Sequence, residues 1–131
     1  MTEFNKKDNP LKDKSENLAD RVMKLYKYLV DVKKENIISK QIMRSGTSVG
    51  ANISEAQFAS SRKDFIQKLK ISEKELSETI FWINRLRNSE HINQKSYDSL
   101  IHDCNEVRAL LSSSIITSKR NACVNEDMSV A

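Results

Sequence analysis

The feature that most constrains the fold is a heptad-spaced apolar stripe in the second half of the chain. Apolar or small residues recur over 65–86 at alternating intervals of four and three, which places them on one side of a helix. Ile66 and Ile80 widen the stripe to the face of a bundle helix. Ser61, followed three residues later by an aspartate, adds a capping-box start, so we predict a helix over 62–88. The repeated positions are Phe65, Leu69, Ser72, Leu76, Thr79, Ile83 and Leu86.

Three more segments have the periodicity of amphipathic helices. The first spans 15–33, with Ser15 as its predicted N-cap. The second spans 37–58, and the last runs from a predicted cap at Asn93 to about residue 118. The connections are short and polar, and the whole chain holds only 2 glycines and 1 proline. We therefore predict an all-α fold, an antiparallel up-down-up-down four-helix bundle.

The chain divides into one folded domain and two polar ends. Residues 1–14 and 119–131 lack a regular apolar pattern, so we expect a flexible N-terminal arm and a flexible C-terminal tail around a bundle domain of residues 15–118. A chain of 131 residues buries enough surface to fold without a metal or disulfide, and its 2 cysteines are predicted to be free thiols. Neither a signal peptide nor a long uncharged run is visible, so we expect a cytoplasmic protein without membrane contact.

The stretch 41–56 carries two stripes at helical spacing. The apolar stripe includes Ile42, Val49 and Ile53, and a polar stripe runs beside it. Many residues between them are small, including both glycines of the chain, which suits close contact with another helix or subunit. The alternative is a loop over 45–50 that joins two short helices. The polar stripe consists of Gln41, Ser45, Ser48, Asn52 and Glu55, with Arg44 beside it.

Arg44 has two candidate acidic partners on the helix over 62–88. If the preceding turn centres near residue 60, antiparallel packing brings Arg44 level with Glu75 and Glu78. Trp82 follows on the same side of that helix. A guanidinium can donate to two carboxylates at once, within one chain or across a subunit boundary. The alternative is a solvated acidic edge beside a partly buried tryptophan.

Basic residues gather in the first turns of the same helix. The whole chain carries 22 Lys and Arg against 18 Asp and Glu, a net charge of +4. Such a cluster is usually a solvated surface, and the alternative is a patch that binds phosphates. The candidate nucleic-acid patch consists of Arg62, Lys63, Lys70 and Lys74, of which all but Arg62 share one helix face.

No pattern typical of an enzyme or cofactor site is present. A di-iron bundle needs a glutamate three positions before each inward histidine, but His91 and His102 follow an asparagine and a serine at that spacing. Cys104 and His102 lack the further ligands of a zinc site. The glycines are spaced G-x-x-x-G, unlike phosphate-binding loops. We therefore predict a non-enzymatic protein that uses no cofactor and no metal.

The chain resembles the four helix bundle protein family that includes the 23S ribosomal-RNA intervening-sequence proteins. The likeness covers about 15–119 and is carried by the segment SKQIMRSGTSVGANISEAQFASSRKDFIQKLKISEKELSETIFWINRL. Its most specific positions are Gln41, Arg44, Ser45, Ser48, Ala51, Asn52, Glu55, Ala56, Asp64, Phe65, Lys68, Lys74, Glu75, Glu78, Thr79 and Trp82.

The resemblance implies a small bacterial protein that assembles as a ring-like homopentamer and catalyses no reaction. Accessory proteins of diversity-generating retroelements are similar in fold and bind nucleic acid. The leading functional hypothesis is a self-assembling bundle whose oligomer presents basic surface to RNA or to a nucleic-acid-handling protein. The alternative is a structural or protein-interaction module with no nucleic-acid role.

Overall fold

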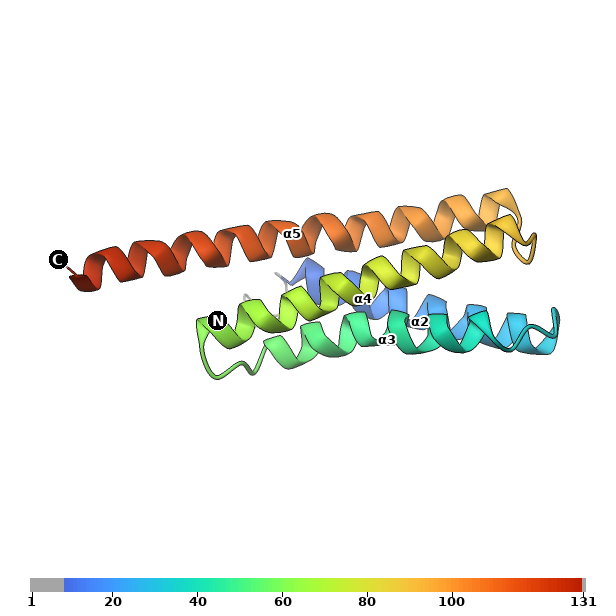
Figure 1. Ribbon diagram of the computed structural model, residues 1–131, viewed down its shortest axis with the longest axis horizontal. Coiled ribbons are helices and arrows are strands. Elements are labelled where there is room, and N and C mark those ends of the chain that lie inside the picture. Colours follow the sequence, from blue (N-terminus) through green and yellow to red (C-terminus); the bar gives the residue numbers. More distant parts are fainter. Residues whose placement is uncertain (1–8, 131) are drawn as a thin grey trace.

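The computed structural model describes the backbone of residues 9–130 and the side chains of residues 9–121. Within this range the chain forms four helices and no strands. Helix α2 packs against α3 and α5, and α4 packs against the same two helices (Figure 1). The prediction of an all-α, four-helix fold is therefore confirmed. The helices are Pro10–Asp31 (α2), Ile38–Ala56 (α3), Arg62–Asn88 (α4) and Gln94–Val130 (α5).

Helix α2 begins five residues earlier than its predicted cap at Ser15. The cap is Asn9, whose Oδ1 accepts a hydrogen bond of 3.1 Å from the backbone N–H of Lys12, and Pro10 occupies the first helical position. Ser15 is buried inside the helix and donates to the Lys12 carbonyl. Residues 10–14 are thus helical rather than part of an arm, and residues 1–8 lie outside the described residues.

Helix α3 is continuous through both glycines, so the alternative of a loop over 45–50 is wrong. Its start is capped by a residue outside the helix, because the Glu35 carboxylate accepts hydrogen bonds of 2.8–3.0 Å from three successive backbone N–H groups. Burial raises the pKa of Glu35, but these three hydrogen bonds outweigh it and the net pKa is lowered. The polar turn before α3 therefore fixes where the helix begins.

The two glycines of α3 mark its closest approach to α2. A β-carbon at Gly46 would lie 2.7 Å from a γ-carbon of Val22, and one at Gly50 would lie 3.3 Å from the Ser15 carbonyl oxygen. Both glycines are therefore used for packing within one chain. The small residues of this stretch do not require a neighbouring subunit.

Helix α4 occupies the predicted range and buries its heptad stripe. Its Ser61 cap accepts the Asp64 backbone N–H at 3.0 Å, as the capping box predicts. The polar members of the stripe bond to α3: the Ser72 hydroxyl donates to the Val49 carbonyl at 2.8 Å, and the Thr79 hydroxyl donates to the Ser45 hydroxyl at 2.8 Å. The stripe therefore buries its hydroxyl groups without leaving them unpaired.

Helix α5 begins at the predicted cap, where Asn93 Oδ1 accepts the Ser96 N–H at 2.8 Å, but it does not end near residue 118. It continues to Val130 and projects past the other helices (Figure 1). Ser118 is the last residue described as buried. No glycine or proline follows Gly50, so nothing interrupts the helical hydrogen bonds beyond the packed region. Residues 119–130 are thus helical, and the flexibility predicted for the C-terminal tail stays a prediction.

Candidate functional site

The candidate site is the outward side of α4, which we call the outer stripe. Its residues follow a 4-3-4-3-4-4 spacing, so they share one side of the helix, and each of them is exposed. Four carry positive charge and none carries negative charge. Arg62 is exposed next to its first residue. The outer stripe consists of Lys63, Gln67, Lys70, Lys74, Ser77, Phe81 and Arg85.

The predicted patch residues lie on or beside this stripe, and like most described lysines and arginines they form no ion pair. Arg21, Arg44 and Lys68 each form ion pairs of 4.0 Å or less with a carboxylate. In the described part of the chain, the four patch residues form none. Their charge is therefore available to an external anion. The patch residues are Arg62, Lys63, Lys70 and Lys74.

Helix α5 adds a cation to this surface that sequence reasoning missed. The like charge of Lys119 is the main cause that lowers the pKa of Lys70, which places the two ammonium groups near each other. Both side chains are exposed. Lys119 falls in the segment predicted to be an irregular tail, so its helical phase was not considered. A prediction that extended α5 by one turn would have placed it near α4.

An aromatic pair lies at the other end of the outer stripe. The rings of Phe81 and Trp82 meet edge to face, with centroids 4.9 Å apart and an angle of 78°. The Arg85 guanidinium carbon lies 5.2 Å from the Phe81 ring centroid. Phe81 remains 50% exposed. Continuing the spacing of the predicted lysines along α4 would have identified Phe81 and Arg85 from the sequence.

Arg44 meets both of its predicted partners within one chain. Its guanidinium donates to Glu75 at 3.2 Å and also to Glu78, and the Trp82 indole N–H donates to Glu78 at 3.0 Å. The side chains of Arg44, Glu75 and Glu78 are 49%, 22% and 36% exposed, so the cluster is partly solvated. The hydrogen bond from Arg44, followed by that from Trp82, lowers the pKa of Glu78.

Most other residues of the polar stripe of α3 form hydrogen bonds or ion pairs with residues of the same chain. Ser48 donates to the Arg44 carbonyl at 2.7 Å, and Asn52 donates to the Ser48 carbonyl at 2.9 Å. Glu55 pairs with Lys68 at 3.0 Å. Ser45 is fully buried against α4, whereas Gln41 is partly exposed. These bonds account for the polar character of α3, and contact with another subunit stays a prediction.

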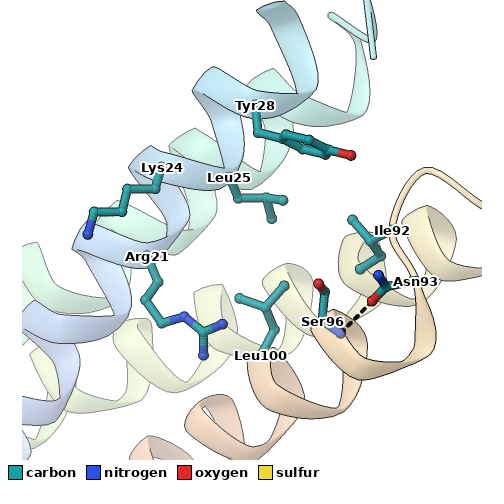
Figure 2. A pocket seen from close by; sticks show the side chains of 8 residues that line it. All are labelled: Arg21, Lys24, Leu25, Tyr28, Ile92, Asn93, Ser96 and Leu100. Carbon is teal, nitrogen blue, oxygen red and sulfur yellow. Dashed lines mark hydrogen bonds between the residues drawn. The ribbon is translucent and has the colours of Figure 1, made fainter. Parts of the chain in front are cut away.

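A cavity of about 480 Å³ lies between α2 and the start of α5 (Figure 2). Leu25, Ile92 and Leu100 point toward its centre, whereas Lys24 points away. The Arg21 guanidinium lies at one end and is already engaged, because it donates to Asp103 at 2.7 Å and to the Ser99 hydroxyl at 3.0 Å. The cavity lining contains neither a histidine nor a carboxylate.

Two groups outside these surfaces have metal-binding or nucleophilic side chains. The ligand atoms of His102, Asp103 and Glu106 lie within 4.8 Å of one another, but Arg21 and Lys14 already pair with the two carboxylates at 2.7 and 3.3 Å. Such cations compete with a metal ion for the same oxygens. Burial raises the pKa of Cys104 to about 12, so its thiol stays protonated at neutral pH.

These features define a four-helix protein whose distinguishing surface is a basic, aromatic-ended helix face. Comparison with known proteins names its family. Residues 7–113 match the family described as 23S rRNA-intervening sequence protein, and the chain belongs to this family. The resemblance stated from the sequence is therefore confirmed. No described helix is long and apolar enough to cross a membrane.

A solved structure shares the fold. It is the crystal structure of a protein of unknown function from the S23 ribosomal protein family of Bacteroides thetaiotaomicron VPI-5482. The two chains are 50% identical, with a TM-score of 0.79 over 80% of this chain and 97% of the other. No curated protein matches the chain.

Proposed function

We propose that this protein is a non-enzymatic, self-assembling bundle of the bacterial cytoplasm that binds RNA, or nucleic acid more broadly, through the outer stripe of α4. One observation carries the proposal: four exposed cations and no acid share one side of α4, and none of the four has an acidic partner in the described chain. Cations that contact phosphates release the counterions of the nucleic acid, which is the main sequence-independent source of affinity. The family name refers to an intervening sequence of 23S rRNA, which makes RNA the first partner to test.

The proposed bundle is antiparallel, with helices that alternate in direction. Contacts between consecutive helices support this arrangement. In an antiparallel pair, residues equally far before and after the connecting turn lie at the same level. Glu55 meets Lys68 close to the α3–α4 turn, and Arg44 meets Glu78 farther from it. The same holds for α4 and α5, where Tyr97 donates to Asn84 at 2.6 Å and Ser112 to Glu73 at 3.3 Å.

The proposed assembly is a ring-like homopentamer, as the family resemblance implies. The partly exposed residues Gln41, Arg44 and Trp82 lie on one side of α3 and α4 and are available for contact with a neighbouring copy. Five copies of a modest phosphate-binding surface on one ring would act together, because linked sites raise the effective concentration of each contact. Light scattering after size exclusion should then give a mass several times 15.1 kDa.

A charge-matched pair of variants tests the nucleic-acid part. The test variant replaces Lys63, Lys70 and Lys74 with glutamine, and the control replaces three exposed lysines elsewhere with glutamine. We expect the plot of log K against log salt for duplex RNA to become shallower in the test variant. The magnitude of its negative slope should fall by about 2–3, because up to three phosphate contacts are lost. The control should retain most of the slope. The control positions are Lys27, Lys33 and Lys95.

The result separates the two functional classes. Equal losses in both variants would show that only net charge matters, and the outer stripe would not be the binding surface. The absence of any salt-dependent complex at micromolar protein, with single-stranded RNA as well as with the duplex, would contradict nucleic-acid binding altogether. A structural or protein-interaction role would then remain.

A further inference from the structure

The outer stripe changes chemistry along its length. Its first three turns carry Lys63, Lys70 and Lys74, and the stripe then passes through Ser77 to Phe81. At a rise of about 1.5 Å per residue, the distance from Lys63 to Phe81 is roughly 27 Å along α4. A phosphate-binding segment is thus followed, on the same side of one rigid helix, by an exposed aromatic ring. This order goes beyond what phosphate binding alone requires.

We infer that the partner of the outer stripe is an unpaired stretch of nucleic acid, whose backbone follows the lysines and one of whose bases stacks on Phe81. This inference rests on the proposed function and specifies its partner. Proteins that bind single strands combine a basic track with aromatic side chains on which bases stack. A duplex keeps its bases stacked inside, so Phe81 would contribute little to duplex binding.

The Phe81 ring has an exposed surface on which a base can stack, and neighbouring side chains hold the ring in position. The ring is half exposed although it packs edge to face on Trp82, at 4.9 Å between centroids, so part of its surface is left open. The Arg85 guanidinium lies over one face of the ring, 5.2 Å from its centroid, so a base would stack on the opposite face while Arg85 supplies a charge for the adjoining phosphate. These contacts hold the ring in place before any partner binds, which reduces the entropy lost on binding.

Charge complementarity favours nucleic acid over a second copy of the chain at this surface. The stripe presents four cations and no acid, so two copies meeting stripe to stripe would bring like charges together. Lys119 of α5 adds another cation beside Lys70. A polyanion neutralises all of these groups, whereas an apolar partner would leave them unpaired.

The experiment compares Phe81→Leu with Tyr28→Leu, which removes an exposed aromatic ring from α2, a helix that does not pack against α4. The probes are fluorescein-labelled 12-nucleotide oligouridylate and oligothymidylate and a 12-base-pair RNA duplex. For both single strands we expect Phe81→Leu to weaken binding by roughly five- to one-hundred-fold in anisotropy titrations, with an unchanged salt slope. The duplex should be affected less than two-fold, and Tyr28→Leu should change none of the three affinities.

Trp82 supplies an independent signal because it is the 1 tryptophan of the chain and touches Phe81. When a single strand binds, the base stacked on Phe81 should quench the fluorescence of Trp82. Binding of the duplex should leave the fluorescence of Trp82 unchanged. If Phe81→Leu weakens the binding of all three probes equally, or of none, the stacking role is wrong. A fall in the light-scattering mass of Phe81→Leu would also overturn the stacking role, because the ring would then belong to a subunit contact.

The two proposals fail in different ways. If the unaltered protein binds no probe at any salt, the proposed function itself is wrong. If it binds the duplex as tightly as the single strands, with both affinities dependent on the lysines, the function stands and the preference for unpaired nucleic acid is wrong.

Discussion

Gly46 provides a direct test of how α2 and α3 pack. A β-carbon there would lie 2.7 and 2.9 Å from the two γ-carbons of Val22. These distances are well inside the separation of about 3.5–4.0 Å at which carbon atoms attract. Val22 is fully buried, and a β-branched side chain has one strongly preferred rotamer in a helix, so its methyl groups do not turn away easily. Gly46→Ala must therefore shift the helices or strain Val22.

Two opposing effects set the size of the change. Replacing a helical glycine with alanine stabilises the helix by about 1 kcal/mol. An extra methyl group in a packed core costs about 1–3 kcal/mol, and contacts this short place the cost in the upper half of that range. We therefore expect Gly46→Ala to lower the free energy of unfolding by about 1–2 kcal/mol. Gly50→Ala is the matched comparison, with a gentler contact of 3.3 Å, and should be close to neutral.

Urea denaturation followed by circular dichroism measures these changes. All variants should be compared at one protein concentration, because the proposed self-association would make apparent stability depend on concentration. In a Val22→Ala background the two short contacts disappear, so Gly46→Ala should cost nothing or stabilise. A gain of about 1 kcal/mol from Gly46→Ala in the unaltered protein would refute the packing described for α2 and α3. An identical loss in both backgrounds would also refute it.

Three further predictions concern charge and helix ends. Hydrogen bonds to the charged form lower the pKa of Glu78, so a pH titration of Trp82 fluorescence should have a midpoint below the ordinary carboxyl value. Arg44→Ala should raise this midpoint. An unmoved midpoint would show that Arg44 does not act on Glu78. Glu35 also has a lowered pKa, so its capping contribution is present above the pKa of the unfolded chain and is lost as pH falls through the lower folded value. Glu35→Ala should accordingly cost about 1 kcal/mol in urea denaturation at pH 7 and progressively less as the assay is acidified, and a cost independent of pH would contradict the capping role. Glu90 has a positive φ of 62°, so Glu90→Gly should stabilise the protein by about 1 kcal/mol in the same assay, and a loss would show that the turn needs the side chain.

Helical spacing and local caps were enough to predict most of the fold. The heptad stripe of α4 and the caps at Ser61 and Asn93 depend on residues close in sequence, and the structure confirms them. Asn9 and Pro10 form an equally local signal, but it stands among polar residues that suggested an arm. Prediction therefore placed the start of α2 too late.

The candidate site was less predictable because spacing shows which side of a helix a residue faces and not what lies opposite. The small residues around Gly46 were predicted to suit another helix or a subunit, and only the structure shows that α2 of the same chain occupies the space at Gly46. The approach of Lys119 to Lys70 depends on how far α5 continues without packing. Arg44 was the favourable case, because a single short turn fixes the register of α3 against α4.

The central claim is that nucleic acid contacts the outer stripe of α4, and photo-crosslinking tests it most directly. Oligouridylate containing 4-thiouridine should be irradiated in complex with the unaltered protein, and the crosslinked peptides should be identified by mass spectrometry after trypsin digestion. We predict that the main crosslink falls in the peptide of residues 75–85, which carries Phe81 between the cleavage sites at Lys74 and Arg85. Crosslinks confined to peptides of α2, or spread evenly over the chain, would contradict the claim.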